Sequence, residues 1–133
     1  GRSLAEDISL GLEEAKAQGV KLKVESLESL SLEQALDIQE AAIARATLGG
    51  WKVGATNAAS QARLGLPEPF RGPIRASEVE ISPLQPPAHS LALARGVEGE
   101  FGLVLGAPLK GSTVTAEEAR DAVALVVPSI ELV

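Results

Sequence analysis

The chain has no cysteine and no methionine, and it contains one tryptophan, two phenylalanines and no tyrosine. The absence of cysteine excludes disulfide bonds, thiol nucleophiles and cysteine-ligated zinc. Because aromatic side chains are so few, a core must be built from leucine, valine, isoleucine and alanine. With 133 residues, of which 45% are apolar and 23% charged, the chain is long enough for one globular domain.

Positive charge is also scarce, since 12 basic residues face 18 acidic residues and the formal net charge is -6. The sequence lacks the basic stripe of a nucleic-acid binder and the basic amphipathic face of a membrane-surface helix. No run approaches the roughly 18 apolar residues of a membrane span, and acidic Glu6 and Asp7 lie where a signal peptide would be apolar. We therefore expect a cytoplasmic protein with neither nucleic acid nor membrane as a partner.

The first half of the chain predicts helices. Apolar residues recur at helical spacing over residues 3–18, and a glycine follows as a stop. Ser31 opens a capping box before a second helix over residues 32–48, which the following glycine pair would end. Asn57 is a candidate N-cap for a third helix over residues 58–64.

The second half predicts strands. Residues 97–105 form the clearest one, a shorter strand is expected at residues 51–55, and a buried strand interrupted by proline is expected at residues 126–133. A capping box predicts a helix over residues 116–125, and proline-rich loops separate the remaining segments. Helices followed by strands with one helix between them form an α+β pattern.

We divide the chain into an N-terminal helical region at residues 1–50 and the first part of a β-rich domain at residues 51–133. The chain ends inside an apolar strand, so we expect the β-rich part to be incomplete at its C-terminus.

Three carboxylates in the last third of the chain are the main candidates for chemistry. Glu98 and Glu100 lie two residues apart in a predicted strand, so their side chains project from the same face. Glu131 follows between apolar residues. Buried like charges are costly unless they are neutralised, and a hard divalent cation with oxygen ligands would neutralise them. The alternative is a solvated acidic strand face, which is the commoner case for such spacing alone.

Lys52, between Trp51 and Val53, is the candidate partner of these carboxylates. A lysine beside a cluster of metal and carboxylates is a plausible substrate clamp or general acid/base. The alternative is a surface lysine whose apolar stem lies along the protein.

Together these segments resemble the fumarylacetoacetate hydrolase superfamily, in particular its 2-oxo-4-pentenoate hydratase and 4-oxalocrotonate decarboxylase branch. Their order and approximate spacing fit over nearly the whole chain. The matching segments are the helix start Ser31-Leu32-Glu33-Gln34, then Lys52-Val53-Gly54-Ala55-Thr56-Asn57, Leu64-Gly65-Leu66, Val97-Glu98-Gly99-Glu100, and Pro128-Ser129-Ile130-Glu131-Leu132-Val133.

The resemblance implies N-terminal helices followed by a mixed, β-roll-like catalytic core and assembly into a homo-oligomer. It implies that Mg²⁺ or Mn²⁺ is bound by Glu98, Glu100 and Glu131. It further implies that the active-site lysine is Lys52 and that a small-molecule 2-oxo acid is contacted by Gly54, Asn57 and Leu64.

The function implied is that of a divalent-metal-dependent lyase acting on an unsaturated 2-oxo acid. The first choice is a 2-hydroxypenta-2,4-dienoate (2-oxo-4-pentenoate) hydratase of aromatic catabolism. Hydratases of this branch usually carry an acid/base aspartate where this chain has Phe70, with Glu68 nearby but shifted. Two alternatives therefore stay open, namely a 4-oxalocrotonate-type decarboxylase and a catalytically weak homologue that acts as a structural subunit of a related enzyme.

Overall fold

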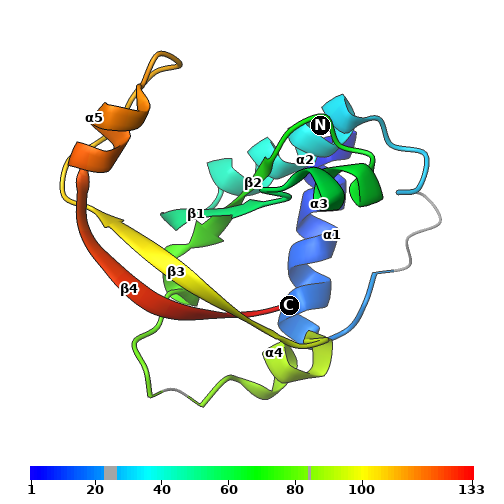
Figure 1. Ribbon diagram of the computed structural model, residues 1–133. Coiled ribbons are helices and arrows are strands. Elements are labelled where there is room, and N and C mark those ends of the chain that lie inside the picture. The colour runs from blue at the N-terminus through cyan, green and yellow to red at the C-terminus, as the bar shows by residue number, and fades with distance from the viewer. Residues whose placement is uncertain (23–26, 84) are drawn as a thin grey trace.

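The computed structural model in Figure 1 describes residues 1–22, 27–83 and 85–133. Its mixture of helices and two small antiparallel sheets confirms the α+β class. The elements in chain order are α1 (Leu4–Gln18), α2 (Leu32–Ala44), β1 (Leu48–Gly54), α3 (Ala58–Leu64), β2 (Phe70–Arg75), the 3-10 helix η1 (Ala76–Glu78), α4 (Ala88–Leu93), β3 (Val97–Leu105), α5 (Ala116–Asp121) and β4 (Val123–Leu132).

Local capping signals set the starts of the helices, and Ser31 and Asn57 cap α2 and α3 as predicted. The hydroxyl of Ser3 accepts a hydrogen bond from the backbone N–H of Glu6 at the start of α1, and Asn57 caps α3 in the same way. Helix α1 ends at Gly19, whose φ of 66° lies in the left-handed region that favours glycine. A Cβ at this position would lie 3.2 Å from the Cα of His89, so glycine also allows α4 to approach α1.

The second helix ends earlier than predicted, at Ala44, and the glycine pair 49–50 lies inside β1 instead of closing a helix. The strand pairing skips Gly49, which forms a bulge. A Cβ there would lie 2.7 Å from the Cα of Ala76. Glycine is therefore required for close contact between β1 and η1, a tertiary reason that helical spacing does not reveal.

Two strands differ from their predictions because pairing with a neighbouring strand overrides local signals. Strand β2 occupies part of a predicted proline loop, with Pro73 opposite Trp51. Strand β4 starts at Val123 and continues through Pro128 without interruption, while α5 ends at Asp121. Both prolines lie in two-stranded sheets, where a missing N–H can face away from the partner strand.

A short extended segment is also expected over residues 20–24 from its alternating valines and lysines. Residues 20–22 form no strand, and residues 23 and 24 lie outside the described residues. Within residues 1–22, 27–83 and 85–133, no helix is long and apolar enough to cross a bilayer.

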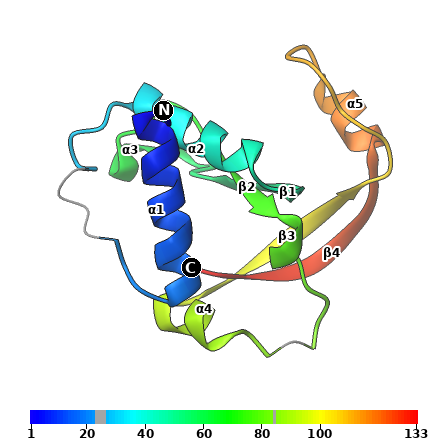
Figure 2. The same ribbon diagram turned by 180° about the vertical axis from the view of Figure 1, so that it is seen from behind.

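The sheet of β1 and β2 lies between the N-terminal helices and the long ribbon of β3 and β4 (Figures 1 and 2). One face of the β1–β2 sheet carries Trp51, Val53, Arg71 and Pro73, and Gln39 of α2 donates to the carbonyl of Arg71 at 3.2 Å. The opposite face carries Lys52, which reaches β4. The β1–β2 sheet thus joins the helices to the ribbon.

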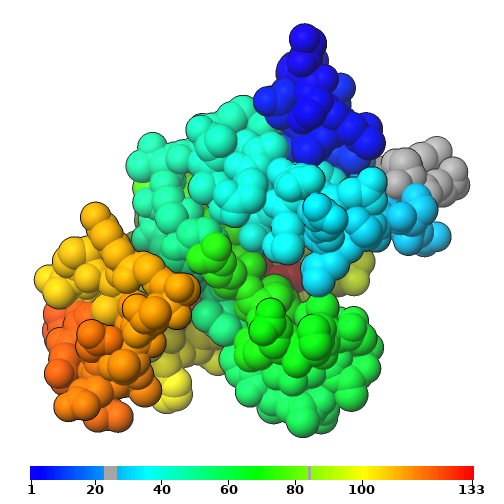
Figure 3. All heavy atoms as spheres, turned by 90° about the horizontal axis from the view of Figure 1, so that it is seen from above, coloured from blue at the N-terminus to red at the C-terminus, as the bar shows by residue number. Residues whose placement is uncertain are grey.

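The sequence predicts a buried strand over residues 126–133, but the β3–β4 ribbon that contains it is largely exposed. Its outer face is entirely apolar, with exposed fractions of 84% for Phe101 and 76% for Ile130. Figures 1 and 3 show α5 at the far end of this ribbon, projecting from the body that the helices form. We define the outer face as Val97, Phe101, Leu103, Val126, Pro128, Ile130 and Leu132.

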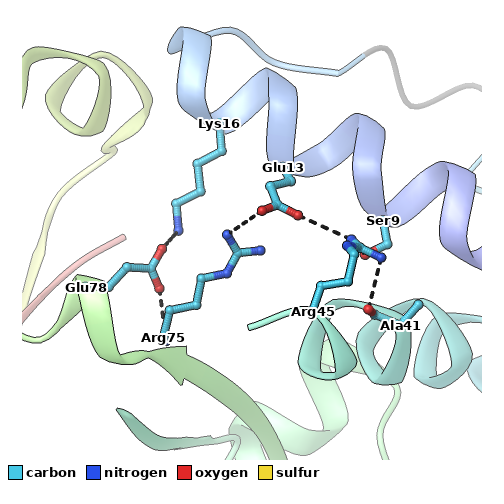
Figure 4. Close-up of polar contacts among 7 residues, drawn as sticks. All are labelled: Ser9, Glu13, Lys16, Ala41, Arg45, Arg75 and Glu78. Atoms are coloured by element: carbon cyan, nitrogen blue, oxygen red, sulfur yellow. Dashed lines mark hydrogen bonds and ion pairs between the residues drawn. The ribbon is translucent and has the colours of Figure 1, made fainter. Parts of the chain in front are cut away.

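Ionic contacts attach α1 to its neighbours (Figure 4). The carboxylate of Glu13 accepts one hydrogen bond from Arg45, the residue that follows α2, at 3.3 Å. It accepts a second one from Arg75, the last residue of β2, at 3.0 Å. Lys16, one turn along α1, pairs with Glu78 of η1. Hydrogen bonds from Arg45 and Arg75 lower the pKa of Glu13.

Glutamine in place of Glu13 is expected to reduce the free energy of unfolding at pH 7 by no more than about 1 kcal/mol, because the carboxylate is 38% exposed and screened. The folded-state pKa of Glu13 lies below its unfolded value, so this contribution is present above the unfolded pKa and lost as pH falls through the folded one. Urea unfolding at pH 7 and below pH 4 measures both effects. Glu14→Gln, an exposed neighbour, is the control, and equal loss in the two variants would contradict a specific role for Glu13.

Candidate metal centre

Strand register brings the three glutamates together on the inner face of the β3–β4 ribbon. Glu98 lies directly opposite Glu131 in the antiparallel pair, and Glu100 lies two residues further along β3. Residues opposite each other and residues two apart share a face of a sheet. Each glutamate offers one carboxylate oxygen, and these oxygens all lie within 4.8 Å of one another.

Lys52 reaches this cluster from the neighbouring sheet. Its Nζ donates to Oε1 of Glu131, so the contact joins β1 to β4. Both side chains are partly withdrawn from water, with exposed fractions of 30% for Lys52 and 26% for Glu131. The second oxygen, Oε2 of Glu131, is buried and accepts no hydrogen bond from any residue that the structure describes. A buried carboxylate oxygen without a partner is costly, and this oxygen is therefore available to a positive ligand.

The raised pKa of Glu100 also indicates that the clustered carboxylates repel one another. Although Glu100 is exposed, partial desolvation by the surrounding chain, followed by the charge of the nearby Glu131 carboxylate, raises the pKa of Glu100 above its ordinary value. Glu98 adds to this effect, whereas the ammonium of Lys52 opposes it. The cluster therefore contains repelling carboxylates that Lys52 alone does not neutralise.

This donor set fits a divalent cation. Three carboxylates less one ammonium leave two formal negative charges, which a doubly charged ion would balance. Carboxylate oxygens are the ligands that Mg²⁺ and other hard cations prefer, and Mg²⁺ keeps open positions for water or substrate. The unpartnered Oε2 of Glu131 supplies an oxygen that the protein itself leaves free for such an ion.

The remaining predicted site residues lie on β1 and α3. Gly54 lies on the same face of β1 as Lys52, but the ring of Phe70 covers it. Asn57 uses its side-chain oxygen to cap α3, where it accepts from the N–H of Ser60 at 2.9 Å. Leu64 is exposed at the other end of α3. No hydrogen bond among the described residues links Asn57 to the glutamates, and contacts of these three residues with substrate stay predictions.

Sequence reasoning missed a contact that holds the turn after β1. Ala55 has a φ of 53°, a left-handed conformation that is uncommon for residues other than glycine. The side-chain amide of Gln61 in α3 donates to the carbonyl of Ala55 at 2.8 Å. This bond fixes the chain three residues after Lys52. No local pattern marks Gln61, because its role depends on the path of the turn.

Two comparisons with known proteins bear on this centre. The chain is 33% identical over 107 residues to the TodF product hydratase of Pseudomonas putida, an alignment covering 80% of the chain and 40% of the hydratase. Its structure superposes on the 4-oxalocrotonate decarboxylase of Pseudomonas putida, solved in complex with magnesium and adipate, with a TM-score of 0.73 and 19% identity. This superposition covers 99% of the chain and 54% of the decarboxylase, and it shows a shared fold. No family model matches the chain.

The chain thus spans about half the length of the solved decarboxylase and less of the hydratase. The hydratase nevertheless agrees with the enzyme branch that the ordered sequence segments resemble, and the decarboxylase shares the fold. The resemblance predicted from the sequence is therefore confirmed.

Proposed function

We propose that this chain, which belongs to the hydratase and decarboxylase branch of the fumarylacetoacetate hydrolase superfamily, forms the metal-binding part of a lyase acting on an unsaturated 2-oxo acid. The first candidate reaction is hydration of 2-hydroxypenta-2,4-dienoate, as in aromatic catabolism. The observation that carries the proposal is the convergence of three glutamates on one strand face, with Oε2 of Glu131 buried and unpartnered.

Each residue of the centre would have a distinct role. Glu98, Glu100 and Glu131 would hold Mg²⁺, or Mn²⁺ in its place, which when bound acts as a Lewis acid toward the oxygens of a 2-oxo acid. Lys52 holds Glu131 in place and lies where it could bind the carboxylate of the acid or transfer a proton. Asn57 and Leu64 would line the path of the remaining carbon chain, and Gly54 would border this path beneath the ring of Phe70.

Decarboxylation of a 4-oxalocrotonate-like acid is the second candidate. It is favoured by the fold shared with the solved decarboxylase and by Phe70, which supplies no proton where the branch usually has an acid/base aspartate. The β-roll-like architecture, the division at residue 50 and a cytoplasmic location remain parts of the proposal.

The test is a product assay on the full protein. With Mg²⁺ present, 2-hydroxypenta-2,4-dienoate should gain one water to give 4-hydroxy-2-oxopentanoate, and EDTA should abolish the reaction. Release of CO₂ from 4-oxalocrotonate without hydration of the dienoate would instead assign the decarboxylase. If neither substrate is consumed although Mg²⁺ binds, the chain is better described as a structural subunit of a related enzyme.

Self-association is also part of the proposal. The outer face of the β3–β4 ribbon is contiguous and apolar, and exposed faces of this kind mark contacts with other polypeptide surfaces. We propose a homo-oligomer in which a second copy covers this face. Sedimentation of the full protein as a monomer at micromolar concentration would refute it.

A further inference from the structure

We propose that Phe70 determines specificity by selecting a 2-oxo acid with an uncharged, apolar tail over one that ends in a second carboxylate. The inference rests on the proposed function, because it concerns the tail of an acid whose head lies at Lys52 and the glutamates. It also separates the two candidate reactions, since the dienoate carries one carboxylate and 4-oxalocrotonate carries two.

The register of β1 and β2 places Phe70 beside the metal centre. Lys52 lies opposite Gly72, and Gly54 lies opposite Phe70, so these four residues share one face of the sheet. Neighbouring pairs on one face are about 7 Å apart along a strand. Lys52 contacts Glu131 of the metal centre from this face. Phe70 belongs to the next residue pair on the same face, so it lies beside Lys52 on the surface that borders the metal centre.

Two glycines let the long side chains lie flat on this face. A Cβ at Gly54 would be 2.5 Å from the Phe70 ring, and a Cβ at Gly72 would be 3.2 Å from Cγ of Lys52. The ring is therefore seated directly on the backbone of Gly54. Phe70 still has an exposed fraction of 43%, so part of the residue remains accessible to a ligand.

This face of the β1–β2 sheet carries one charged side chain, which is positive. It carries Gly50, Lys52 and Gly54 from β1 and Phe70, Gly72 and Ile74 from β2, so Lys52 is its single cation. The nearest arginine in β2, Arg71, lies on the opposite face with its guanidinium 4.4 Å from the centre of the Trp51 ring.

A distal carboxylate placed on the Phe70 ring would lose water without gaining a cationic partner from this sheet, which disfavours its binding. A methylene or vinyl group in the same place would gain apolar contact instead. The arrangement of β1 and β2 therefore favours binding of the monocarboxylic acid, although Phe70 itself supplies no proton for its hydration.

Calorimetry with two matched probes tests the inference. In Mg²⁺, the full protein is titrated with 2-oxopentanoate and with 2-oxopentanedioate, which differ in the terminal carboxylate. The native protein should bind the monoacid about tenfold or more tightly. Phe70→Ala should reduce this preference to about twofold, whereas Phe70→Leu, which keeps an apolar wall, should retain most of it. The control Val53→Ala, on the opposite face, should leave the preference unchanged.

The outcomes are separable because Mg²⁺ affinity is measured on each variant before the acids are added. Equal or tighter binding of the diacid by the native protein, or an unchanged preference in Phe70→Ala, would overturn the role of Phe70 and leave the metal centre intact. The same loss in Val53→Ala as in Phe70→Ala would also overturn it, because the effect would then be structural. Failure of both acids to bind Mg²⁺-loaded native protein would overturn the proposed function as well.

Discussion

Glutamine in place of Glu131 is expected to weaken Mg²⁺ binding by at least about 100-fold, which is the largest effect of any single change at the centre. The substitution removes the charge of one of the three proposed ligands. It also replaces one of the two oxygens of Glu131, whose Oε2 is buried without a partner among the described residues, by an amide NH2 group. In addition, it removes the negative charge that pairs with Lys52, so the ammonium adds an uncompensated positive charge beside the ion. Isothermal calorimetry on the full protein measures the affinity directly.

Glu98→Gln/Glu100→Gln should have a comparable effect, because it removes the charges of two proposed ligands on β3 while keeping the pair between Lys52 and Glu131. Glu117→Gln in α5 is the matched control, since this exposed acid belongs to no described metal cluster. Mg²⁺ affinity that stays within about twofold of the native value in both site variants would show that the glutamates do not form the metal site.

Methionine in place of Lys52 is the second prediction with a large effect. It keeps much of the stem packed along Gly72 but leaves the carboxylate of Glu131 without its donor. Removal of one partner from a buried pair costs about 3–5 kcal/mol, and partial exposure here reduces the expected loss of stability to about 1–3 kcal/mol. Turnover should fall at least about 100-fold if the ammonium contacts substrate.

The metal ion separates these two effects. Because an added cation replaces the lost positive charge, saturating Mg²⁺ should restore most of the stability of Lys52→Met but not its turnover. Urea unfolding with and without Mg²⁺, together with steady-state rates, provides the two measurements. Lys52→Arg is the control that keeps the charge. Full turnover in Lys52→Met would limit Lys52 to a structural role.

Local sequence patterns were sufficient for the helix starts and for the candidate ligands. Ser31 and Asn57 cap helices where the sequence predicts them, because a cap involves residues only three apart. The common face of Glu98 and Glu100 follows from the two-residue period of a strand. These features depend on neighbours along the chain, which the sequence shows directly.

The tertiary structure alone decided how the pieces meet. The pairing of Glu98 with Glu131 depends on the register of two strands separated by α5, and a shift of one residue would turn Glu131 to the outer face. The contact of Lys52 with Glu131 depends on how two sheets approach each other, and the seat of Phe70 on Gly54 depends on β2 forming within a predicted loop. Such contacts join residues that are distant in sequence and are selected by packing and pairing energies. Local patterns therefore identify which residues could carry the chemistry, whereas only the folded chain brings Lys52, Glu98 and Glu131 together.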